Sequence, residues 1–194
     1  ASGCVLVPGG EVVISGGYDG MLLWHEVASG KCVRRVKAHD FWSWQVALSP
    51  DGKLVATVTG QYLAGGERYE PAGEVEPSVK VYDARSGDLV HVFSHGPPVL
   101  SVAFSHDGRY LAAGNLMGEV RIWDLEKPAV GPVVVKSDGF TSWGSIKSHH
   151  YCGGIYGVRF APGDESVVVC GMGAMTDPMA GNGKMTWQRW AWRE

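Results

Sequence analysis

The chain has 194 residues, 45% of them hydrophobic, with 17 basic and 20 acidic side chains and a formal net charge of −3. No apolar run approaches the roughly 20 residues that a membrane-spanning helix needs, and the balanced charge lacks the basic excess that binds a nucleic-acid backbone. We therefore expect neither a membrane nor a nucleic acid as partner. The 28 glycines, about twice the ordinary share, indicate many tight turns and an all-β chain.

The first residues, Ala1–Ser2–Gly3, run directly into an apolar segment. They carry no basic region followed by an apolar run and a cleavage site, so we expect no signal peptide. A start without Met or a leader indicates a processed or excised piece of a longer protein. The cytoplasm is slightly favoured as the compartment.

A repeated pattern of two strands and a tight turn organises the chain. The four copies are CVLVPGGEVVISGGYDG from Cys4, VALSPDGKLVATVTG from Val46, SVAFSHDGRYLAAG from Ser101 and GVRFAPGDESVVVCG from Gly157. Their turns are Gly9–Gly10, Asp51–Gly52, Asp107–Gly108 and Gly163–Asp164. The central residues of a tight hairpin turn need positive φ, which these residue types tolerate. Each copy therefore predicts a β-hairpin.

A third strand follows each hairpin and ends on an aromatic residue. These aromatics are Trp24, Tyr82, Trp123 and Trp190. A fourth strand follows in the first three units, as CVRRVKA, LVHVFSH and VGPVVVK. The chain therefore predicts three four-stranded antiparallel units and one unit of three strands.

The period, the stretch VAFSHDGRYLAAG and the pairs Trp123–Asp124 and Tyr82–Asp83 resemble the WD40 family of β-propellers. The resemblance implies one propeller segment over residues 1–194, with four-stranded blades forming a partial ring. The blade units are expected at about 3–38, 41–95, 98–136 and 154–194. Because a seven-bladed ring of this family needs roughly 290 residues, we expect further blades, or self-association with a second copy, to close it.

The resemblance also implies a buried hydrogen-bonded group in each blade, made of His, Ser or Thr, Asp and Trp. This chain keeps fragments of that group, and we assign a structural role to its remaining members and to the strand-ending aromatics: Asp19, Trp24, His39, Tyr82, His95, Trp123 and Trp190. The third unit carries Met117 where Asp is expected. We therefore expect blades held more by apolar packing than by polar networks.

Three segments exceed the repeat, at residues 61–77, 138–153 and 173–184. In the propeller geometry that the resemblance implies, all three open on one face, usually called the top. They and the segment entering the second unit are rich in aromatic residues, which anchor protein interfaces. Some of these rings are alternatively expected to pack under their own loops. The candidate binding residues are Phe41, Trp42, Trp44, Tyr62, Arg68, Tyr69, Trp143, His149 and Tyr151.

Catalytic and metal-binding motifs are absent from the sequence. It contains no G-x-S-x-G, P-loop or H-E-x-x-H motif. His149, His150 and Cys152 are the only cluster with metal-ligand chemistry, and adjacent His side chains in an extended segment point in opposite directions. We expect no catalytic residue, metal or cofactor, and a scaffold that binds a protein or peptide through the top face. Two alternatives stay open: a metal or catalytic site in the inserts, and a purely structural arc of a larger multidomain protein.

Overall fold

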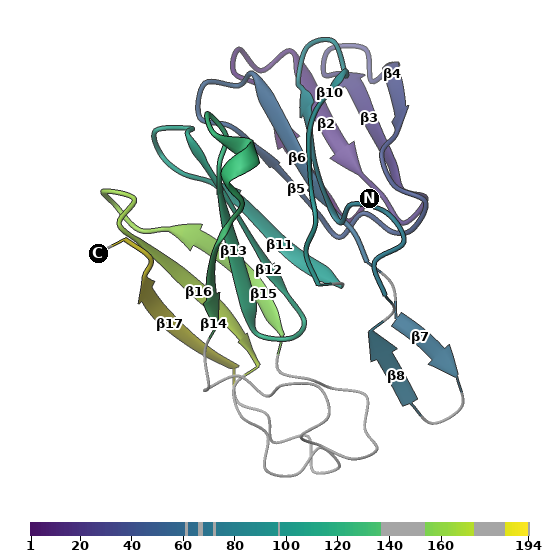
Figure 1. Cartoon of the computed structure of the whole chain (residues 1–194). Coiled ribbons are helices and arrows are strands. Elements are labelled where there is room, and N and C mark those ends of the chain that lie inside the picture. Colours follow the sequence, from purple (N-terminus) through teal and green to yellow (C-terminus); the bar gives the residue numbers. More distant parts are fainter. Residues whose placement is uncertain are drawn as a thin grey trace.

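The computed structural model describes residues 1–60, 62–65, 68–71, 73–96, 98–136, 154–172 and 185–193. In this part of the chain, four antiparallel sheets follow one another in sequence order and form an open arc (Figure 1). The innermost strand of each sheet contacts the innermost strand of the next. No helix in the described part of the chain is long and apolar enough to cross a membrane. The chain is therefore an all-β partial propeller.

The first two sheets have four strands each. The first consists of β1 (Gly3–Leu6), β2 (Val12–Gly16), β3 (Met21–Glu26) and β4 (Cys32–Lys37). The second consists of β5 (Gln45–Leu48), β6 (Leu54–Val58), β9 (Val79–Asp83) and β10 (Leu89–Phe93). A separate hairpin of β7 (Tyr62–Gly65) and β8 (Arg68–Pro71) lies between β6 and β9, so the insert expected at residues 61–77 contains strands.

The third and fourth sheets differ in strand number. The third consists of β11 (Val99–Phe104), β12 (Tyr110–Asn115), β13 (Glu119–Asp124) and β14 (Val133–Lys136), with a 3-10 turn η1 (Pro128–Val130) before β14. The fourth consists of β15 (Ile155–Phe160), β16 (Ser166–Met172) and β17 (Met185–Ala191). In the described residues β17 is an edge strand.

The hairpin turns form from local side-chain chemistry. In the second sheet, the Ser49 hydroxyl donates to Oδ1 of Asp51 (2.7 Å) and accepts the N–H of Leu54 (2.9 Å). Ser105 makes the same pair of bonds in the third sheet, to Asp107 (2.6 Å) and from Tyr110 (2.8 Å). Gly52 follows Asp51 with φ of 73°, which L side chains rarely adopt. The Ser-x-Asp-Gly pattern therefore sets where these strands begin and end.

The hydrophobic core lies between neighbouring sheets rather than inside one of them. Ile14, Leu22 and Trp24 of the first sheet pack on Val46, Val55 and Tyr82 of the second. Val79, Val81 and Phe93 of the second pack on Val102, Leu111 and Trp123 of the third. A similar layer joins the third sheet to the fourth. Each sheet is thus stabilised mainly by its neighbours.

The strand-ending aromatics lie in these layers. Trp24 donates its Nε1–H to the carbonyl of Ala84, in the turn that follows β9 of the second sheet, at 2.7 Å. Trp123 is 2% exposed and stacks on Phe93 at a centroid distance of 4.9 Å. Trp190 packs half-buried against the layer between the third and fourth sheets. These side chains therefore join adjacent sheets.

Candidate functional site

The loop between β4 and β5 is held against the turn between β2 and β3. The N–H groups of Ala38 and His39 both donate to the carbonyl of Gly20, at 2.9 and 3.0 Å, and the N–H of Ser43 donates to the carbonyl of Gly17 at 3.0 Å. Gly20 has φ of 71°, and a Cβ there would lie 2.1 Å from the carbonyl oxygen of His39. Only glycine fits this turn. This end of the sheets is the expected top face and is the lower end in the view of Figure 1.

Four aromatic side chains meet on this face. The rings of Phe41 and Trp42 stack at 4.9 Å, Tyr18 lies 4.9 Å from Trp42, and Trp44 lies 5.4 Å from Trp42. Tyr18 is 59% and Trp42 40% exposed. Trp44 is half-buried, lies 6.1 Å from Tyr18, and donates its Nε1–H to the carbonyl of Gly60 at 2.8 Å. We call Tyr18, Phe41, Trp42 and Trp44 the aromatic cluster.

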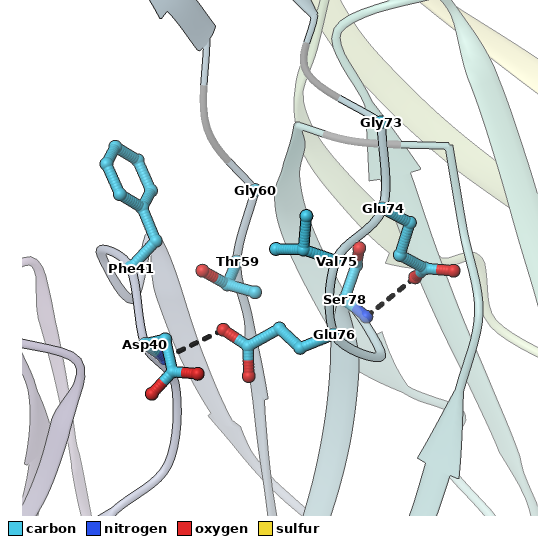
Figure 2. Close-up of a pocket in the computed structure, with 9 residues that line it drawn as sticks. All are labelled: Asp40, Phe41, Thr59, Gly60, Gly73, Glu74, Val75, Glu76 and Ser78. Atoms are coloured by element: carbon cyan, nitrogen blue, oxygen red, sulfur yellow. Dashed lines mark hydrogen bonds between the residues drawn. The ribbon is translucent and has the colours of Figure 1, made fainter.

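A small acidic pocket adjoins the aromatic cluster (Figure 2). It has a volume of about 80 Å³ and shares Phe41 with the cluster. Glu76 accepts the backbone N–H of Asp40 at 2.7 Å, and Glu74 accepts the N–H of Ser78 at 2.8 Å. Its lining is Asp40, Phe41, Thr59, Gly60, Gly73, Glu74, Val75, Glu76 and Ser78.

Two of the three carboxylates in the acidic pocket have no cationic partner among the described residues. Glu76 is paired, because Nζ of Lys80 lies 2.5 Å from its Oε2. Burial raises the pKa of Glu76, but hydrogen bonds from Lys80 and the Asp40 N–H outweigh burial and bring the pKa below its ordinary value. Asp40 and Glu74 are exposed. The pocket therefore presents excess negative charge beside exposed aromatic rings.

Buried histidines lie at this end of the second and third sheets. His39 is 1% exposed, and its Nδ1 is 3.7 Å from Oε2 of Glu76. Burial, aided by the charge of Lys80, lowers the pKa of His39 to about 4. His95 is equally buried, its Nε2 is 3.1 Å from the carbonyl oxygen of Ala113, and burial lowers its pKa to about 3. Both rings are therefore neutral at pH 7.

Glutamates stand near these histidines where aspartates were expected. Oε1 of Glu119 lies 3.9 Å from Nδ1 of His95, as Glu76 lies near His39. The turn that contains Met117 is held by Asn115, whose Oδ1 accepts the N–H groups of Met117 (3.0 Å) and Glu119 (2.9 Å). At 3.7 and 3.9 Å the two glutamates make no hydrogen bond to the neutral histidines, so the expectation of blades held more by apolar packing than by polar networks stays a prediction. The sequence reasoning missed both glutamates because they are displaced from the expected position.

The structure brings together part of the predicted binding surface. Phe41, Trp42 and Trp44 meet, and Tyr18, Asp40, Glu74 and Glu76 join them without having been predicted. Tyr18 had a usable signal, since its turn between β2 and β3 opens on the same face as the inserts. In the described part of the chain, no group of three His, Cys, Asp or Glu side chains is arranged to hold a metal ion.

The side chains of the remaining predicted binding residues are not among those that the structure describes. The backbone of Tyr62, Arg68 and Tyr69 lies in the β7–β8 hairpin. Trp143, His149, His150, Tyr151 and Cys152 lie outside the described residues, as do the inserts 138–153 and 173–184.

The sequence matches a family model and several known proteins. A family model described as WD domain, G-beta repeat matches residues 30–66 and 87–124. The serine-threonine kinase receptor-associated protein of Gallus gallus is 31% identical over 137 residues, which cover 71% of this chain and 34% of that protein. The target of rapamycin complex subunit wat1 of Schizosaccharomyces pombe is 29% identical over 122 residues, covering 61% of this chain and 34% of that protein. The chain spans about a third of the length of these relatives.

A solved structure gives the same fold. The WD40 repeats of RRP9 align with this chain at a TM-score of 0.63 and 16% identity, over 88% of this chain and 44% of that one. The repeat matches, the relatives and the sheet architecture agree. The chain therefore carries WD40 repeats at two positions and has the fold of WD40 β-propellers.

Proposed function

We propose that this chain binds a protein or peptide partner through the top face, as a scaffold without a catalytic role. The observation that carries the proposal is the aromatic cluster, in which Tyr18 and Trp42 stay exposed while the half-buried Trp44 contacts both rings. Rigid aromatic side chains of this kind supply most of the binding energy in many interfaces. The adjoining acidic pocket adds charge that favours Lys or Arg in the partner, because cations bind both carboxylates and aromatic faces.

The names of the relatives support association with other proteins. One relative is named as a receptor-associated protein and another as a subunit of a complex. This chain spans about a third of each. The proposal therefore rests on the geometry of the top face and takes no particular partner from them.

The test is to truncate the exposed rings and measure the affinity of a partner isolated with the unaltered protein. Trp42→Ala and Tyr18→Ala should each weaken binding about tenfold or more, since a central aromatic anchor contributes roughly 2 kcal/mol. Lys53→Ala and Arg109→Ala, which lie just past hairpin turns at the opposite end of the sheets, serve as controls and should leave the affinity unchanged. A partner that responds to the control variants and ignores both rings would end the proposal.

We propose in the same way that another blade, from this polypeptide or from a second copy, packs against the fourth sheet. Cys170 pairs with Gly157 on one side and Trp187 on the other, so the three residues form one row on the sheet. Trp187 is 70% exposed, and Cys170 is exposed beside it. An apolar row of this kind is normally covered in a propeller. If a second copy covers the row, light scattering should show that the unaltered protein self-associates and that Trp187→Ser reduces this self-association. A monomeric unaltered protein would contradict coverage by a second copy.

A further inference from the structure

A second groove lies between the first and second sheets at the end opposite the top face. Its walls are the β1–β2 hairpin, strands β3 and β4, the β5–β6 turn and the turn that follows β9. It has a volume of about 720 Å³, within the range of sites that bind small ligands and short chain segments. Every residue that lines it is described, so both walls are known. We call it the inter-blade groove.

The floor of the inter-blade groove is apolar. The Trp24 ring is buried in it, and its Nε1–H is already used in the bond to the Ala84 carbonyl. Val12 is half-buried beside the ring, and Val33 stands 60% exposed on the rim. A ligand resting here therefore meets carbon atoms, which favours an apolar side chain of leucine or phenylalanine size.

The rim of the inter-blade groove is cationic. Arg34, Lys53 and Arg85 line it and are exposed, against the single carboxylate of Asp83. In the described part of the chain neither guanidinium has an ion-pair partner, and the Lys53 pair with Asp51 (3.1 Å) is fully open to solvent screening. The net charge of the lining is therefore positive.

Two contacts make this charge available to a ligand. Oδ1 of Asp83 accepts the N–H groups of Arg85 (2.9 Å) and Ser86 (2.6 Å), so its charge is directed into its own turn. The stem of Arg34 packs on the same turn, because a Cβ at Gly87 would lie 2.8 Å from its Cδ. Gly87 thus leaves room for Arg34, which is held beside the groove.

We infer that the inter-blade groove binds an extended acidic segment of a protein partner in which carboxylates alternate with apolar side chains. The apolar side chains would rest against Trp24, Val12 and Val33, and the carboxylates would pair with Arg34 and Arg85, which offer two parallel donors each. Successive side chains of an extended segment point to opposite sides, which matches a groove with an apolar floor and a charged rim. The surface is independent of the top face and has the opposite charge.

The experiment measures fluorescence anisotropy of a labelled ten-residue peptide that alternates Glu or Asp with Leu or Phe, titrated with the protein. Two matched peptides separate the contributions: one replaces the acids with Gln and Asn, the other replaces the apolar residues with Ser. We expect binding of the first peptide and at least tenfold weaker binding of both others. Equal binding of the neutral peptide would overturn the inference.

Variants locate the binding. Arg34→Glu combined with Arg85→Glu should weaken binding of the acidic peptide at least tenfold. Lys127→Glu combined with Lys136→Glu makes the same change of four charge units on the third sheet, away from the groove, and should leave the affinity for the peptide unchanged. If this control variant weakens peptide binding as much, the attraction is only the overall charge of the protein and the inference fails. Melting curves of each variant confirm that it is folded.

Two further measurements show whether the peptide is held by a simple anion site or by the top face instead. Inorganic phosphate at millimolar concentration should not displace the peptide, and displacement as effective as that by unlabelled peptide would show a simple anion site. Trp42→Ala should leave the acidic peptide bound as before. If Trp42→Ala abolishes binding of this peptide, the peptide binds the top face and the inference is overturned. If Trp42→Ala instead leaves the affinity of the top-face partner unchanged, only the proposed function fails and the result for the groove stands.

Discussion

Two sets of aromatic side chains differ in their surroundings. Those at the ends of the third strands are buried between sheets, whereas those on the top face include rings exposed to solvent. Trp24, Tyr82 and Trp123 are 2–4% exposed between adjacent sheets, whereas Tyr18 and Trp42 are 59% and 40% exposed. A side chain near the end of a third strand faces the neighbouring sheet. Tyr18 and Trp42 lie in a turn and a loop beyond the ends of the strands and stay exposed, although Ala38, His39 and Ser43 of the same loop as Trp42 are buried. Position relative to the next blade, rather than residue type, therefore separates the structural aromatics from the candidate binding aromatics.

The largest expected effect comes from emptying a layer between sheets. Trp123→Ala should lower the free energy of unfolding by about 3–5 kcal/mol, because it removes a large ring packed on Phe93 and leaves a cavity. Denaturant unfolding measures this, with Trp123→Phe as the control that keeps most of the packing. A loss below about 1 kcal/mol, as expected of a surface residue, would mean that Trp123 does not serve as core.

The second effect is a loss of stability in mild acid. His39 and His95 have folded pKa values of about 4 and about 3, below the unfolded value of about 6.5. Below pH 6.5 the unfolded chain therefore binds protons that the folded chain does not. Their contribution to stability is fully present above pH 6.5 and falls as the pH drops toward the folded pKa values. Together the two histidines should lower the free energy of unfolding by about 2–3 kcal/mol between pH 7.5 and pH 5.5.

Urea unfolding at these two pH values measures the loss. The charged groups that face the two histidines are Glu76, Lys80, Glu119 and Arg121. His39→Gln should remove about half of the pH dependence, whatever its own effect on stability. An unfolding free energy that does not change from pH 7.5 to 5.5 would show that the rings are not held neutral.

A third effect isolates one polar contact between blades. Trp24→Phe keeps a ring in the layer and removes the hydrogen bond from Nε1 to the Ala84 carbonyl. Loss of one such bond should cost about 1 kcal/mol, more if the carbonyl is left without a partner. Thermal unfolding measures the loss. The matched control is Trp190→Phe, because the Nε1–H of Trp190 donates to Gln188 within its own strand. Equal losses in the two variants would deny the bridging role of Trp24.

The smallest effect on stability is expected on the top face. Trp42→Ala should change the free energy of unfolding by no more than about 0.5 kcal/mol, since the ring is partly in water and closes no layer between sheets. Its effect on partner affinity should be large, because the exposed ring is a proposed anchor. A loss of stability comparable to that of Trp123→Ala would erase the distinction between the two sets of aromatics.

Much of the fold could be predicted because its signals are local. The turn at Asp51–Gly52 follows from the Ser49 hydroxyl, the Asp51 carboxylate and a glycine at positive φ, all within four residues. The hairpin of β7 and β8 was not predicted, since residues 61–77 lack the long apolar alternation of the other strands. It pairs through the backbone, for which side-chain patterns are a weak guide.

The candidate site could be predicted only where its residues are neighbours in sequence. Phe41, Trp42 and Trp44 are recognisable as an aromatic loop. Tyr18 joins them because backbone hydrogen bonds hold that loop on the turn at Gly17 and Gly20. Glu74 and Glu76 come from the last residues of the insert 61–77, and their position beside Asp40 depends on where β9 enters the sheet.

The sequence alone thus determined the strands, the tight turns and the aromatic residues available for packing, because these depend on period-two alternation and on turn chemistry within a few residues. The tertiary structure decided which aromatics are buried, which carboxylates meet on the top face, and that Arg34, Lys53 and Arg85 line one groove. Those relations join residues from different blades. They arise from how neighbouring sheets pack, and pattern within one blade carries no information about the residues that the next blade places against it.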